Sequence, residues 1–210
     1  PKALSVSVVG EFNKYDGRVH LMERIEDTGV FELFIPGLAA GCGYMYEIKR
    51  QGKGTTRKLD PVSRQISSVP IIASVVSDEN MPDSYAWNDG LWMIKRKKEA
   101  GKKKPVTVYE VSLTDWLKEK SADELVDFVK QEGYTHVCFL PVAEYLNEEM
   151  NGYSTLGYFA VTHRIGGSDA FKKLVDDCHN AGIGVIIDWN GAYFGTEAKG
   201  LYDFDGADAY

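Results

Sequence analysis

An apolar, β-branched run that ends in a carboxylate is the stretch of this sequence best suited to chemistry. Residues 183–194 read I-G-V-I-I-D-W-N-G-A-Y-F, so Asp188 follows directly on the run. Such a run is typical of a buried strand, and parallel α/β folds place their chemistry at the carboxyl ends of strands. The spacing therefore predicts that Asp188 lies on the floor of an active site.

Other residues that could do chemistry lack the neighbours that a site needs. His136 and His163 show no triad or metal-ligand spacing. The cysteines Cys42, Cys138 and Cys178 are far apart without a CxxC pair, which predicts free thiols in a reducing compartment. No metal-ligand cluster is visible, so the residues predict no metal site.

The elements that position Asp188 alternate between strands and helices. The predicted elements are a strand over 106–113, a helix from the cap Ser121 to Gly133, a strand over 135–142, a helix from the cap Ser168 to Gly182, and a strand over 183–189. Ser121 and Glu124 have the spacing of a capping box. The order β-α-β-α-β implies a parallel sheet with right-handed crossovers.

Two parallel architectures fit this order. A doubly wound nucleotide-binding sheet usually carries G-x-G-x-x-G after a strand, and no strand here is followed by it. A (β/α)₈ barrel carries its site on the loops after its strands. The long loop after Val142, rich in Gly and Tyr, and the terminal Asp188 favour the barrel.

The first part of the chain has a different, all-β pattern. Short strand-like runs cover 5–9, 30–35 and 44–49, with turn signals between them, which is typical of a small β-sandwich. From Asp60-Pro61 onward, an irregular stretch is expected up to the basic run at 95–104.

Composition narrows the classes of partner. The 210 residues are 44% hydrophobic and 26% charged, with a net charge of −7, and no apolar run approaches the ~18 residues of a membrane span. The run 95–104 holds seven basic residues and one acid. A solvated linker is favoured there over a polyanion site, because charge runs alone are weak motifs. We therefore expect neither a nucleic-acid nor a membrane partner.

Seven segments in order carry a family resemblance across almost the whole chain. They are V-V-G-E-F-N-K-Y-D-G (8–17), G-V-F-E-L-F-I-P-G (29–37), Y-A-W-N-D-G-L-W (85–92), V-Y-E-V-S-L (108–113), G-Y-T-H-V-C-F-L-P-V-A-E (133–144), G-Y-S-T-L-G-Y-F-A-V-T-H-R-I-G (152–166) and V-D-D-C-H-N-A-G-I-G-V-I-I-D-W (175–189). This ordered set resembles bacterial glycogen (1,4-α-glucan) branching enzymes of the α-amylase superfamily.

The resemblance implies a domain order. An immunoglobulin-like, carbohydrate-binding-type β-sandwich is expected over 1–75, and a bridging segment with the basic linker over 76–104. Residues 105–210 are expected to hold strands one to three of an incomplete (β/α)₈ TIM-barrel catalytic domain.

The resemblance also implies a reaction, which in this family needs neither a metal nor an organic cofactor. Branching enzymes cut an α-1,4-glucan such as glycogen or amylose and transfer the piece to a 6-hydroxyl, in a cytoplasmic step of glycogen biosynthesis. The family's mechanism is a retaining one that passes through a covalent glycosyl-enzyme, and it needs two carboxylates about 5–5.5 Å apart. The family supplies them after the fourth and fifth strands, and a further Asp after the seventh. These positions follow Tyr210, so no catalytic residue is assigned and the chain alone is expected to be inactive.

Four substrate-binding residues follow from the family pattern. Tyr153 matches a tyrosine that stacks on sugar, Tyr158 lies on the same loop, and Asp188 matches an Asp that organises the site floor. The family motif Asp-Trp-Val-Pro-Ala-His-Phe here reads D-W-N-G-A-Y-F over 188–194, which puts Tyr193 in place of the histidine. A phenol donates one hydrogen bond but carries no positive charge.

Two alternatives stay open at this stage. One is a glucan-binding module without catalysis. The other is a related debranching or trehalose-forming hydrolase with the same domain order. Three barrel strands leave an open parallel edge, so we expect that the isolated fragment self-associates, or that it is an excerpt of a longer ordered chain.

Overall fold

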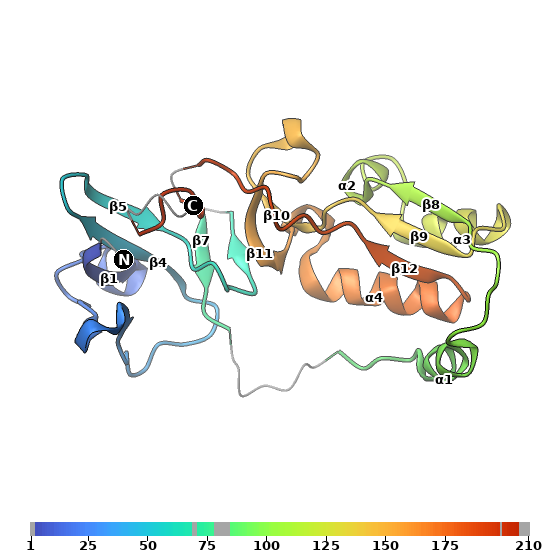
Figure 1. Ribbon diagram of the computed structural model, residues 1–210, viewed down its shortest axis with the longest axis horizontal. Helices are drawn as coiled ribbons and strands as arrows, with labels where there is room; N and C mark the ends of the chain where they lie inside the picture. Colours follow the sequence, from blue (N-terminus) through green and yellow to red (C-terminus); the bar gives the residue numbers. More distant parts are fainter. Residues whose placement is uncertain (1–2, 69–70, 78–84, 198, 206–210) are drawn as a thin grey trace. The chain divides into compact units, whose positions relative to one another are not determined.

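The computed structural model describes residues 3–68, 71–77, 85–197 and 199–205 (Figure 1). The chain divides into two compact units. The first comprises Pro1–Asn80, Ala143–His163 and Gly191–Tyr210, and the second comprises Met81–Val142 and Arg164–Asn190. The first unit therefore takes in two later stretches of the chain as well as its beginning.

The first unit is built on a five-stranded antiparallel sheet. Its strands are β1 (Ala3–Gly10), β4 (Gly43–Arg50), β5 (Gly54–Lys58), β6 (Ile66–Ser67) and β7 (Ala73–Val75). Their order is β1-β4-β7-β6, with β5 also paired to β4. The expected β-rich start is confirmed, but β6 and β7 lie where an irregular stretch was expected. Strands of two or three residues are too short to show a period of two in sequence.

Both faces of this sheet are covered. Side chains alternate between the two faces of a strand, and Val9 and Met45 point to the face where Leu156 and Ala160 of β11 (Thr155–Val161) pack. The opposite face, with Val6 and Ile48, packs against Phe31. The stretch over 30–35 thus contributes only β3 (Val30–Glu32), which pairs with β2 (Glu23–Ile25).

The loop expected after Val142 is largely an antiparallel ribbon. It consists of β10 (Ala143–Tyr145) and β11, whose pairing has two register shifts. The register shifts break the simple alternation, which explains why the sequence pattern predicts a loop there. The first unit also contains the short 3₁₀ turns η1 (Glu11–Asn13), η2 (Glu26–Thr28) and η3 (Glu148–Met150). A fourth turn, η4 (His163–Ile165), starts in this unit with His163, and its other residues belong to the second unit.

The second unit contains the predicted parallel sheet. Its strands are β8 (Val108–Val111), β9 (His136–Phe139) and β12 (Gly184–Ile187), in the order β12-β9-β8, and both pairings are parallel. Its helices are α1 (Gly90–Glu99), α2 (Leu113–Trp116), α3 (Ala122–Gln131) and α4 (Gly167–Asn180). Figure 1 shows α4 running along this sheet.

Helices α3 and α4 begin differently. The capping box of α3 is confirmed, because Ser121 Oγ accepts from Glu124 N at 3.2 Å and Glu124 Oε2 accepts from Ser121 N at 2.7 Å. The predicted cap at Ser168 is wrong. The N-cap of α4 is Gly166, whose φ of +88° suits a residue without Cβ.

One further expectation about the second unit is wrong, and one helix there was not expected. The run 183–187 was expected to be a buried strand, yet Ile186 and Ile187 are 39% and 45% exposed, because β12 is an edge strand of the three-stranded sheet. The first half of the basic run, expected to be a solvated linker, continues α1 to Glu99 and buries no residue, so the linker stays a prediction. Lys and Arg are good helix formers, which explains the continuation.

Candidate carbohydrate-binding site

Asp188 lies where the parallel sheet ends. Its backbone N donates to Phe139 O at 2.8 Å, which extends the pairing of β12 with β9 by one residue. Its side chain is partly buried. Burial raises the pKa of the neighbouring Cys138 thiol, and the negative charges of Glu110 and Asp188 raise it further. Asp188 thus contributes negative charge at the carboxyl end of the sheet, as its position in the sequence suggested.

The structure brings Tyr158 and Tyr193 together. The Tyr158 hydroxyl donates to the backbone oxygen of Tyr193 at 2.8 Å, although the two residues are 35 positions apart. Burial raises the pKa of Tyr158, so its phenol remains a donor at neutral pH. The side chain of Tyr193 stays 65% exposed. Tyr158 therefore fixes the backbone that presents the Tyr193 ring to solvent.

Tyr153 lies shortly before Tyr158 in the sequence. It is partly buried and follows Gly152, whose φ is +86°, and its backbone N donates to Met150 O at 2.9 Å. The next residue, Ser154, donates to Glu197 Oε1 at 3.4 Å. No sequence pattern indicates this contact, because the two residues are 43 positions apart and follow no motif.

Residues 153–158 and 193–197 thus run together in the first unit. Besides the bonds at Tyr158 and Ser154, Gly195 N donates to Thr155 O at 3.1 Å. Glu197 Oε2 is buried and has no hydrogen-bond partner among the described residues. Three of the four predicted site residues, Tyr153, Tyr158 and Tyr193, lie on this pair of segments, while Asp188 belongs to the second unit.

Polar contacts also hold the segment 199–205 on the five-stranded sheet. Leu59 N donates to Lys199 O at 2.9 Å. Lys58, which is buried, donates through Nζ to Tyr202 O. Burial lowers the pKa of Lys58, and the charge of Arg50 lowers it further. Arg50 in turn donates to the Asp203 carboxylate.

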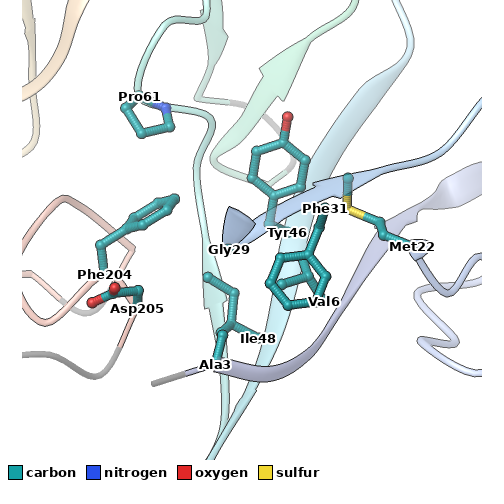
Figure 2. Close-up of a pocket in the computed structure, with 10 residues that line it drawn as sticks. All are labelled: Ala3, Val6, Met22, Gly29, Phe31, Tyr46, Ile48, Pro61, Phe204 and Asp205. Atoms are coloured by element: carbon teal, nitrogen blue, oxygen red, sulfur yellow. The ribbon is translucent and has the colours of Figure 1, made fainter. Parts of the chain in front are cut away.

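This segment forms one wall of a cavity in the first unit. The cavity measures about 400 Å³, and Figure 2 shows the side chains around it. The lining residues are Ala3, Val6, Met22, Gly29, Phe31, Tyr46, Ile48, Pro61, Phe204 and Asp205. Its walls are mainly apolar and include three aromatic rings, a composition that pockets for small ligands share.

No metal centre accompanies these sites in the described ranges. Across residues 3–68, 71–77, 85–197 and 199–205, no three His, Cys, Asp or Glu side chains gather in a way that could hold a metal ion. None of the described helices has the length and apolar character that crossing a membrane requires.

Comparison with known proteins shows which proteins the chain is similar to. The family model of carbohydrate-binding module 48, the isoamylase N-terminal domain, matches residues 1–63. Over its whole length the chain is 41% identical to the 1,4-alpha-glucan branching enzyme GlgB of Nitrosococcus oceani, 43% to that of Methylococcus capsulatus and 41% to that of Gloeobacter violaceus. The chain spans 29% of the length of the first two relatives and 30% of the third.

Solved structures share the fold. A Salmonella typhimurium structure assigned as an alpha amylase matches 94% of this chain and 31% of its own, with a TM-score of 0.69 at 24% identity. The GBS pullulanase SAP, solved in complex with maltotetraose, matches 90% of this chain and 30% of its own, with a TM-score of 0.60 at 19% identity. At these identities the likeness shows an amylase-type fold and nothing about activity.

Proposed function

The chain matches the amino-terminal portion of 1,4-alpha-glucan branching enzymes, and on that premise we propose that it holds α-1,4-glucan for a branching reaction. The similarity of 41–43% over all of its residues carries this proposal. The whole protein is then proposed to cut an α-1,4-glucan and form α-1,6 branches in cytoplasmic glycogen biosynthesis. The three free cysteines are compatible with that reducing compartment.

We propose the domain division 1–75, 76–104 and 105–210 for the whole protein. In it, residues 105–210 supply strands one to three of a (β/α)₈ barrel. The parallel order β12-β9-β8, with crossover helices α3 and α4 between successive strands, supports this proposal. The first segment corresponds to the matched carbohydrate-binding module.

The site residues receive distinct roles in this proposal. Tyr153 and Tyr193 offer aromatic faces to glucose rings, since the C–H face of a sugar packs well on an aromatic ring. Tyr158 positions Tyr193 through its hydrogen bond to the backbone. Asp188 organises the floor of the site by accepting hydrogen bonds, and acts neither as nucleophile nor as acid/base.

Affinity electrophoresis tests glucan binding directly. In native gels containing glycogen we expect the chain to be retarded, and we expect Tyr193→Ala to raise the apparent Kd about 3–10-fold, the loss of one aromatic contact. Tyr202→Ala is the matched control, because that ring is also exposed, at 48%, but lies outside the paired segments. Mobility independent of glycogen would refute the proposed binding.

A glucan-binding module without catalysis is the second candidate. The observation that favours it is the altered stretch after Asp188, where Tyr193 occupies the histidine position of the family motif. The two candidates differ in the whole protein incubated with amylose. A fall in iodine absorbance with new α-1,6 linkages supports branching, whereas glycogen binding without that fall supports the module. The chain alone is predicted to leave amylose unchanged.

A further inference from the structure

A second cavity of the first unit lies at the end of β6 and has a lining that is partly polar and partly apolar. It measures about 360 Å³, and its lining includes Gln65, Ile66, Ser67, Ser68, Val75 and His163. None of the four predicted site residues contributes to it. Cavities of about 300–1,000 Å³ are the size that small ligands occupy.

A buried carboxylate orients the histidine of this cavity. Glu144 is only 3% exposed, and its Oε2 accepts from His163 N at 2.9 Å and lies 3.0 Å from His163 Nδ1. Its Oε1 accepts from the hydroxyl of Thr162 at 3.2 Å. A carboxylate at this position favours the proton on Nδ1, which leaves Nε2 outside the contact with Glu144.

The polar atoms that line the cavity suit hydroxyl groups. His163 Nε2, the Gln65 side-chain amide and the Ser68 hydroxyl have no hydrogen-bond partner within the described part of the chain. The amide and the hydroxyl can each donate and accept, as sugar hydroxyls do. The one lining residue able to carry charge, His163, already faces the Glu144 carboxylate, which disfavours an anionic ligand.

We propose that this cavity binds hydroxyl groups of an α-1,4-linked glucose oligomer, with His163 Nε2, Gln65 and Ser68 as hydrogen-bond partners. The inference rests on the proposed function, because it names a place where the first unit holds its glucan. The polar side chains of Gln65, Ser68 and His163 in its lining distinguish this site from the apolar cavity of Figure 2 and from the aromatic faces of Tyr153 and Tyr193.

Imidazole nitrogen shifts test the site in the unaltered chain. During titration with maltoheptaose we expect the Nε2 resonance of His163 to move saturably, while those of His20 and His136 stay in place. Unmoved His163 resonances at maltoheptaose concentrations that saturate the chain would overturn the inference. Retardation in glycogen gels would then persist and leave the proposed function standing, whereas loss of retardation would remove both.

A pair of glutamine variants provides a second measurement. Gln65→Ala should raise the Kd for maltoheptaose about 5-fold, as expected when one hydrogen bond is lost. Gln51→Ala is the matched control, because Gln51 is also exposed in the first unit but lies in the turn between β4 and β5. Equal Kd values for the two variants, with circular dichroism spectra like that of the parent chain, would contradict the proposed site.

Discussion

At the scale of single residues, two tyrosines that share one carboxylate make the free energy of unfolding depend on pH in the alkaline range. Tyr44 and Tyr46 donate to Asp60 Oδ2 at 2.6 and 3.3 Å, and burial, followed by the negative charge of Asp60, raises the pKa of both phenols. A raised folded pKa contributes stability below the unfolded pKa of about 10, and this stability is lost as the pH rises above it.

The variant Tyr44→Phe isolates this contribution. At pH 7 it should lower the free energy of unfolding by about 1 kcal/mol, because one buried hydrogen bond is lost. Toward pH 11 the difference should shrink, since only the parent chain has Tyr44 to ionise on unfolding. Urea denaturation at pH 7 and pH 11 measures both values. A difference that grows with pH would contradict the assigned direction of the shift.

The residue scale also shows the limit of sequence reasoning about the site. Asp188 and the tyrosines could be proposed as site residues from the sequence, because strand ends and family motifs are local patterns. Their hydrogen-bond partners could not be predicted. The Tyr158 hydroxyl donates to the backbone oxygen of Tyr193, 35 positions away, and Glu144 contacts His163, 19 positions away. Such pairs arise from tertiary packing, which no local pattern encodes.

At the scale of elements, the first residues of helices α3 and α4 allow a paired test of stability. Ser121→Ala should lower the free energy of unfolding of the second unit by about 1 kcal/mol, because the hydroxyl accepts from Glu124 N. Ser168→Ala should change it by less than about 0.5 kcal/mol, since Ser168 lies inside α4 and caps nothing. Thermal denaturation compares the two variants, and equal losses would mean that Ser168 acts as a cap after all.

The elements predicted best are those with long, regular patterns. The β-α-β-α-β order, the parallel pairing and the capping box of α3 follow from hydrophobic periodicity and cap residues. The short strands β6 and β7 and the ribbon β10–β11 were missed, because two or three residues or a shifting register leave no period to detect. Helix α1 was missed because it buries no residue and so has no apolar face to predict it.

At the scale of the whole chain, stretches distant in sequence build one core. Leu156 and Ala160 come from the stretch assigned in sequence to the barrel, yet they pack with Val9 and Met45 of the amino-terminal sheet. The later segment 199–205 adds polar contacts to the same unit through Lys58 and Arg50. The compact units therefore do not follow the linear order of the sequence, since the first unit is made of three separate stretches of the chain.

The exposed apolar side chains of the parallel sheet lead to a prediction about association. Val108 and Ile186 lie on the same face of the sheet and are 43% and 39% exposed. Strands β8 and β12, which carry them, are the two edges of the described sheet. Exposed apolar surface beside unpaired strand edges favours association, because pairing buries the surface and satisfies the edge.

We therefore expect the 210-residue chain to self-associate, with an apparent mass in light scattering that rises with concentration. Ile186→Lys should lower that mass, because a charge on the sheet face opposes burial of the face against another copy. Leu91→Lys is the matched control: Leu91 is 84% exposed in the same unit, but on α1, so association should persist in that variant. A parent chain that stays monomeric at every concentration would contradict the prediction. Equal masses for the two variants would show that copies meet elsewhere than at this sheet.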